Sequence, residues 1–244
     1  MRRALLTTLV VATACGLRDV SGPPGREQVV VQGILNAQRA EQELWIERST
    51  PAGEPIGGDP LPLQPPPSRV EVRDTAGNVF SFSADTANPR RFVATFTPVA
   101  GARYDLLIEV GSRVVQATAV VPRTIAIVDP ALDSVIAAPN SLLSVAWTGP
   151  NRWVRVAAVV PDSQTFDVLP QWVMNDTTAQ VMIYPSYPRV VVWVLAVDSV
   201  TARAADPAGF RGDFEPFGQF RGNITGGTGF FGAATSDHVI VRVQ

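Results

Sequence analysis

The stretch Tyr104-Asp-Leu-Leu-Ile-Glu-Val-Gly-Ser-Arg-Val-Val-Gln-Ala-Thr-Ala-Val-Val121 decides the fold class of this chain. Tyr104–Val110 and Val114–Val121 are rich in β-branched and other apolar residues that recur with a period of two, the pattern of half-buried strands. Gly111-Ser112 stands between them. It predicts a two-residue hairpin loop, because glycine supplies the positive φ that such loops favour.

Similar short strands are predicted on both sides of this hairpin. Asp74-Thr-Ala-Gly-Asn78 predicts a turn between two of them. No segment favours a helix longer than about three turns, so the pattern predicts an all-β protein. The further strands predicted are Val29–Leu35, Glu43–Arg48, Arg69–Asp74, Val79–Ser83, Phe92–Phe96, Ser141–Thr148, Arg152–Val160, Ala179–Tyr184, Arg189–Val197 and His238–Val243.

The strands group into two β-sandwich domains, with Pro122–Pro130 as the junction between residues 28–124 and 125–244. Both resemble immunoglobulin or fibronectin type III modules. Tyr104, after Pro98 and Gly101, resembles the corner at which a tyrosine hydroxyl bonds back to the backbone. Leu143–Thr148 resembles a fibronectin type III strand whose tryptophan, here Trp147, fills the core.

Val190–Val197 (VVVWVLAV) is apolar on both faces. This predicts a strand that is central in its sheet or covered by the C-terminal segment. Trp193 is therefore expected in the core.

The N-terminus predicts export and lipid anchoring. Residues 1–14 combine Arg2 and Arg3, a short apolar run and a small-residue cleavage site, the pattern of a signal peptide. Cys15, the only cysteine, follows directly and resembles the lipidated cysteine of bacterial lipoproteins. Gly16 at the next position favours the outer membrane in relatives of this pattern. Residues 15–27 read as a lipidated tether.

The amino-acid composition excludes several classes of functional site. The 20 basic residues are all arginine, there is one histidine, and the formal net charge is −2. A zinc cluster of His and Cys ligands is excluded, no metal or cofactor is expected, and the weakly acidic balance argues against nucleic acid. Gly227-Thr-Gly-Phe-Phe-Gly232 is not read as a dinucleotide motif, because a strand rather than a helix follows it. Ser236-Asp-His238 is not read as a triad, because neighbouring strand residues face opposite sides.

Residues 203–237 form a Gly/Phe-rich segment with eight glycines and six of the eleven phenylalanines. Its aromatic side chains either pack on the sandwich or form an adhesive surface. Trp172 is expected outside a clear strand and open to a ligand. The candidate ligand or partner contacts are Trp172, Phe214, Phe217, Asp213 and Glu215.

The chain resembles a family of bacterial surface lipoproteins named domain of unknown function 4249. The resemblance rests on the lipidation motif, on Val29–Ile34 and on the hairpin Val70–Asp74 with Gly77-Asn78. Its most specific part is Gly222-Asn-Ile224 followed by Gly227–Ala233. The family implies an outer-membrane location, often beside TonB-dependent transporters. It implies no activity, cofactor or catalytic residues.

Together these features predict a non-catalytic binding or accessory lipoprotein whose partner is an outer-membrane transporter or its substrate. A carbohydrate-binding or adhesive module is the alternative, with Trp153, Trp172, Tyr184, Tyr187 and Trp193 as a stacking platform. A hydrolase using Asp213 and Glu215, calcium binding by loop acids and a purely structural envelope role are further readings.

Overall fold

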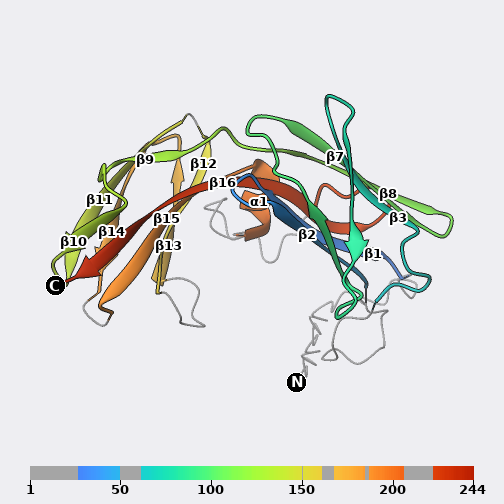
Figure 1. Cartoon of the computed structure of the whole chain (residues 1–244), viewed down its shortest axis with the longest axis horizontal. Helices are drawn as coiled ribbons and strands as arrows, with labels where there is room; N and C mark the ends of the chain where they lie inside the picture. The colour runs from blue at the N-terminus through green and yellow to red at the C-terminus, as the bar shows by residue number, and fades with distance from the viewer. Residues whose placement is uncertain (1–26, 50–61, 150, 161–167, 185–186, 206–221) are drawn as a thin grey trace, which may run out of the picture.

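The computed structural model describes residues 27–49, 62–149, 151–160, 168–184, 187–205 and 222–244. They form an arch built almost wholly of strands (Figure 1), so the all-β prediction is confirmed. The strands are β1 (Val29–Asn36), β2 (Glu41–Arg48), β3 (Arg69–Asp74), β4 (Val79–Ser81), β5 (Ser83–Ala84), β6 (Arg91–Thr95), β7 (Arg103–Val110), β8 (Arg113–Val120), β9 (Ala126–Asp129), β10 (Ser134–Ala137), β11 (Ser141–Thr148), β12 (Trp153–Val159), β13 (Val168–Met174), β14 (Thr178–Ile183), β15 (Arg189–Val197) and β16 (Thr228–Val243); the helix α1 is Ser199–Ala205.

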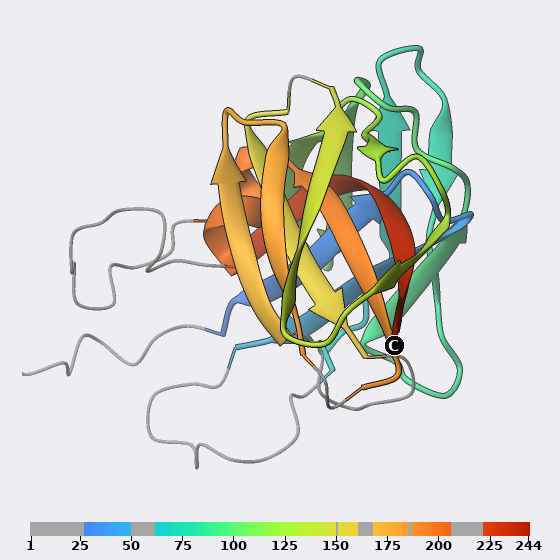
Figure 2. The same cartoon turned by 90° about the vertical axis from the view of Figure 1, so that its left-hand side faces the viewer.

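One large sheet runs through the whole arch. Its strand order is β13-β12-β15-β16-β1-β2-β6-β5, and β10 also pairs with β16. The sheet β4-β3-β7-β8 packs over one end and the sheet β14-β11-β9 over the other, so each end is a two-layer β-sandwich. Figure 2 looks along the arch with the second sandwich nearest the viewer. The two smaller sheets lie on the convex side, whereas α1 lies on the concave side (Figure 1).

Strand β16 joins the two sandwiches. Its first half pairs in parallel with β1, from Val30↔Thr228 to Asn36↔Ala234. Its second half pairs antiparallel with β15, from Val197↔Ala234 to Arg189↔Arg242. Because strand side chains alternate, the same strand turns odd-numbered residues toward the smaller sheets and even-numbered residues toward the concave side.

Each sandwich has its own apolar core. The first contains buried residues between Val29 and Val121 together with Phe231 and Ala233 from β16. The second contains residues between Ile125 and Ala196 together with Val239 and Val241 from β16. β16 contributes residues to both cores, so the last strand of the chain completes the first sandwich. The predicted division of the chain at residue 124 assigned all of this strand to the second domain. That division itself stays a prediction.

Three local expectations are confirmed in the structure. The backbone N–H of Val99 donates a 2.9 Å hydrogen bond to the hydroxyl of Tyr104, which is fully buried. Gly111, at φ 58°, begins the two-residue loop between β7 and β8. Trp147 is 2% exposed in the second core, as expected from its resemblance to the fibronectin strand.

Other expectations were wrong. The last strand begins at Thr228 rather than His238, so ten residues expected in a loop belong to a sheet. Trp172 lies inside a strand, β13. Trp193 is not a core residue: β15 is central, as predicted, but it buries its even-numbered residues and turns Trp193 outward, where it is half-buried. The missed elements also include β9, β10 and α1, and the predicted strand Val79–Ser83 divides between two sheets.

Phe231→Ala should reduce the free energy of unfolding by about 3–5 kcal/mol, because Phe231 is 0% exposed and truncation leaves a cavity in the first core. Phe230→Ala is the matched control, since its side chain points to the other face of the same strand and is only half-buried. Denaturant unfolding measures both. Equal midpoints for the two variants would contradict this assignment of faces.

Candidate binding surface

The start of β16 depends on close approach of backbones. Gly229 has φ 103°, and a Cβ there would overlap the carbonyl oxygen of Val31 on β1. A Cβ on Gly226 would likewise overlap the carbonyl oxygen of Val114. These glycines let the chain leave the edge of β8 and enter the large sheet beside β1, as the sequence predicted for the glycines of this segment.

Asn223 fixes that crossing with its side-chain amide. Its Nδ2 donates to the carbonyl oxygens of Thr118 and Phe231, each at 2.7 Å, and its Oδ1 accepts from the N–H of Phe231 at 2.9 Å. Two bonds between Thr225 and Gln116 tie the same segment to β8. One asparagine therefore links the small sheet to the first strand residues that enter the core.

The helix α1 packs on the concave face at the middle of the arch. Asp198 precedes it and accepts a 2.8 Å bond from the N–H of Thr201. A Cβ on Gly232 would overlap the hydroxyl oxygen of Thr201, so glycine is what allows the helix to lie directly on β16. Burial raises the pKa of Asp198 against the opposing effect of these hydrogen bonds.

A hollow of about 420 Å³ opens on the concave face beside α1. Ligand sites commonly have this size and combine apolar walls with a few polar groups. Ile34, 40% exposed, lies in its wall. The register places Trp45, Gln32 and Phe230 in one row across β2, β1 and β16. The remaining wall residues are Gly33, Asn36, Arg39, Glu41, Gln42, Glu43, Leu195, Thr201 and Ala234.

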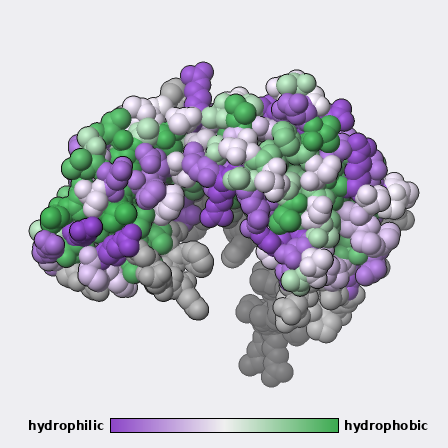
Figure 3. Space-filling view, viewed as in Figure 1, coloured by the Kyte–Doolittle hydropathy of each residue, from purple (hydrophilic) through white to green (hydrophobic). Residues whose placement is uncertain are grey.

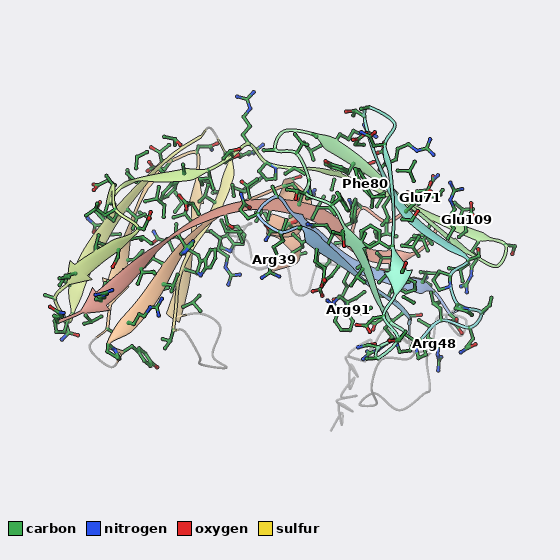
Figure 4. The ribbon with its side chains drawn as sticks, viewed as in Figure 1. Arg39, Arg48, Glu71, Phe80, Arg91 and Glu109 are labelled. Atoms are coloured by element: carbon green, nitrogen blue, oxygen red, sulfur yellow. The ribbon has the colours of Figure 1, made fainter. Side chains whose placement is uncertain are left out.

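Arg91 organises the charges at the edge of this hollow. Its guanidinium bonds to Glu43 at 3.0 and 3.1 Å, to Glu41 at 2.7 Å and to Asp85 at 2.8 Å. Its hydrogen bonds lower the pKa of Glu43 and of Asp85, and both carboxylates in turn raise the pKa of Arg91. Figure 4 shows Arg91 and Arg39 on the concave side of the arch. The acids are thus ion-paired and held in fixed positions rather than left as a cation site.

The second half of the concave face is aromatic. Trp172, Trp153 and Trp193 lie on the outward side of three adjacent strands, β13, β12 and β15. Trp193 stacks on His238 with ring centroids 4.6 Å apart. A second hollow of about 170 Å³ is lined by Arg155, Ala157, Val159, Trp193 and Leu195. Since Leu195 lines both hollows, they belong to one continuous surface.

The predicted site residues are only partly covered by the described structure. Trp172 is half-buried on the concave face, packed against Val197, Ala202 and Ala234. Cys15, Asp213, Phe214, Glu215 and Phe217 lie outside the described residues. The sequence reasoning missed Trp45, Ile34 and Arg91. Outward positions in the alternating pattern of β1, β2 and β6 were the signal for these residues, but strand partners were needed to bring them together.

The consecutive residues Ser236, Asp237 and His238 do not form a catalytic triad. Asp237 Oδ2 accepts from the N–H of Ile127 on the convex side, whereas His238 is exposed on the concave side, so Ser236, Asp237 and His238 do not converge. The described residues contain no group of three or more His, Cys, Asp or Glu arranged to hold a metal. No helix within the described ranges is long and apolar enough to cross a membrane.

Comparison with known proteins identifies the family. The model of the domain of unknown function DUF4249 matches residues 19–162, more than half of the chain. The chain belongs to this family. The match contains β1 to β12, and the glycine-rich segment that completes the first sandwich lies beyond it.

Two other comparisons add little to this assignment. A two-domain fibronectin type III segment of chicken tenascin aligns over 71% of this DUF4249 chain and 90% of its own, with 14% identity and a TM-score of 0.23. The search of curated proteins returned no match.

Asn223→Ala should reduce the free energy of unfolding by roughly 1–3 kcal/mol, because it leaves part-buried backbone groups of Phe231 and Thr118 without their partner. Asn78→Ala is the control, since the amide of Asn78 bonds to Asp74 in an exposed turn. Chemical unfolding compares the two. A loss for Asn223→Ala no larger than that for Asn78→Ala would contradict the proposed link.

Arg91→Gln should make the free energy of unfolding less dependent on pH in the acidic range. Glu43 and Asp85 have lowered pKa values in the folded state, so their contribution is present above the ordinary carboxylate pKa of about 4 and is lost as the pH falls through the folded values. The stability difference between the native chain and the variant should therefore be largest at neutral pH and shrink below about pH 4. Urea midpoints from pH 7 to pH 3 measure it.

Arg152→Gln removes the same charge where the guanidinium lies over the Trp153 ring instead of beside carboxylates. Its stability difference should change little over this pH range. A difference for Arg91→Gln that stays constant down to pH 3 would show that the ion pairs do not carry the effect.

Proposed function

We propose that this DUF4249 protein is a non-catalytic binding lipoprotein of the bacterial outer membrane, and that the concave face of its arch is the binding surface. The observation that supports this proposal most is the 420 Å³ hollow with the row Trp45, Gln32 and Phe230. The hollow is lined mainly by strand residues, so its shape is set largely by sheet geometry. A preformed site of this kind loses little conformational entropy on binding.

The partner is an outer-membrane transporter or the substrate that the transporter imports. The signal peptide and Cys15 would tether the arch to the membrane, since a diacylated cysteine gives stable anchoring. The 12 residues from Cys15 to Arg26 would form the tether between this anchor and the first sandwich. The polar and charged rim around an apolar centre is the usual anatomy of a protein interface.

Carbohydrate binding is the second candidate. It is favoured by the three tryptophans that share the outward face of β12, β13 and β15. Aromatic faces offer large apolar area with specific geometry, which suits a ligand with an apolar face and a polar edge. This candidate uses the same concave surface, so the two readings differ only in what occupies it.

A photoreactive amino acid at position 34 should cross-link to the partner in native membranes, because Ile34 is in the wall of the hollow. Position 114 is the matched control: Val114 is 51% exposed on β8, in the sheet of the convex side. Mass spectrometry of the cross-linked products identifies the partner. Products of equal amount and identity from both positions would overturn the concave face as the site.

Cys15→Ser should abolish metabolic labelling by a fatty-acid analogue and release the protein from the membrane fraction, because the thiol is the acylated group. Ser21→Ala, in the same tether, is the control and should leave labelling unchanged. Labelling that persists in Cys15→Ser would remove the lipoprotein assignment while leaving the binding surface untouched.

A further inference from the structure

Among the described residues, cationic side chains gather on the concave face of the second sandwich. The outward positions of β15 and of the second half of β16 include Arg189, Arg242 and His238, all exposed. Arg155 adds a further cation on β12. The described parts of β10, β12, β13 and β15 contain no Asp or Glu at all. In β16 the one acid, Asp237, bonds to Ile127 of β9, in the convex-side sheet. This asymmetry stands out in a chain whose formal net charge is −2.

Arg189 and Arg242 are cross-strand partners. The register pairs them directly, at the end of β15 and β16 farthest from α1. Like charges in this position destabilise a sheet. Among the described residues, neither side chain has an ion pair or hydrogen bond to relieve the repulsion. A ligand that brings an anionic group between them would turn this unfavourable pair into two charge-assisted contacts.

Between these arginines and α1 the surface is apolar and then aromatic. The next outward row pairs Val191 with Ile240, and the row after that pairs Trp193 with His238. His238 packs on one face of the Trp193 indole. On the β12 side of the indole the small residue Ala157 leaves room, and this is where the 170 Å³ hollow lies. Arg155 and Leu195 close the hollow toward α1.

The Trp193 row lies four residues from the Arg189 row, a distance of about 13 Å along the strand. We propose that this strip binds an acidic oligosaccharide: one sugar ring enters the hollow and stacks on the Trp193 indole, and Arg189 and Arg242 bind the carboxylate of another sugar in the chain. The proposal rests on the concave-face function given above and names the class of its ligand.

The position of the strip within the sheet argues for side-chain recognition of a sugar. β12 and β15 pair with a strand on each side, and β16 pairs with β15 on one side and with β1 and β10 at its two ends on the other. An extended peptide therefore finds no open sheet edge along this strip. A flat lipid bilayer does not fit the inside of an arch (Figure 3). Nucleic acid carries a charge at each nucleotide and is bound through a continuous basic stripe, whereas here apolar rows separate the cations.

The test uses the full chain purified from membranes in detergent and titrated with oligogalacturonate, with the same oligomer after methyl esterification as the uncharged control. Tryptophan fluorescence and calorimetry report binding. We expect the acid form to bind at least tenfold more tightly than the ester and to weaken as salt is added. Alginate and sulfated oligosaccharides extend the panel to other acidic sugars.

Three variants locate the site. R189Q/R242Q should weaken binding of the acid form by tenfold or more and make it nearly equal to the ester, while unfolding at the same or a higher denaturant concentration than the native chain. W193A should abolish binding of both forms. The charge-matched control R73Q/R103Q, on β3 and β7 of the other sandwich, should bind as the native chain does.

Failure of every acidic sugar, equal affinity for acid and ester, or unchanged binding by R189Q/R242Q would each overturn this inference. Tighter binding of a single-stranded oligonucleotide, an acidic peptide or anionic vesicles than of any sugar would also overturn it. Cross-linking from position 34 to a membrane partner would still support the proposed function in any of these cases, so the two failures can be told apart.

Discussion

The parallel pairing of β16 with β1 is the constraint on which the arch depends. Without it the first sandwich lacks Phe231 and Ala233 in its core, and the large sheet divides into two. Parallel pairing of β1 with β16 brings together residues from opposite ends of the described chain, so the chain between them must fold back before this contact can form. The glycines at 226 and 229 and the amide of Asn223 serve this one junction, which explains physically why they occur together in the sequence.

The shared strand also determines what kind of surface the molecule presents. In two domains joined by a linker, the site between them would change shape as the domains move. Here β16 alternates without interruption from Phe230 to Arg242, so hydrogen bonds along one strand fix the orientation of both halves. The concave face therefore behaves as a single sheet surface, and α1 can lie across its middle because Gly232 leaves room.

The strands were predictable to the extent that they bury one face. β3, β11 and β15 match their predicted bounds exactly, because alternation and β-branched residues are local signals. The first ten residues of β16 were not predictable in this way. Glycine weakens a strand and is typical of loops, whereas here Gly229 is needed because the backbone passes close to the carbonyl of Val31. The outward position of Trp193 was missed for a related reason. A strand that is apolar on both faces does not show which face meets the core.

The candidate site was predictable least of all, and the reason is register. Arg91 meets Glu43 across 48 residues of sequence, and Arg189 meets Arg242 across 53, so no window of sequence contains either pair. The two pairs lie on the same face, but one joins opposite charges that attract and the other joins like charges that repel. Arg91 is satisfied by three carboxylates and stiffens the rim of one hollow, whereas the like charges of Arg189 and Arg242 weaken the sheet that carries them. Opposite charges directly across two strands stabilise a sheet, whereas like charges in that position destabilise it. An anionic ligand bound between Arg189 and Arg242, as we propose, would replace this repulsion with two charge-assisted contacts.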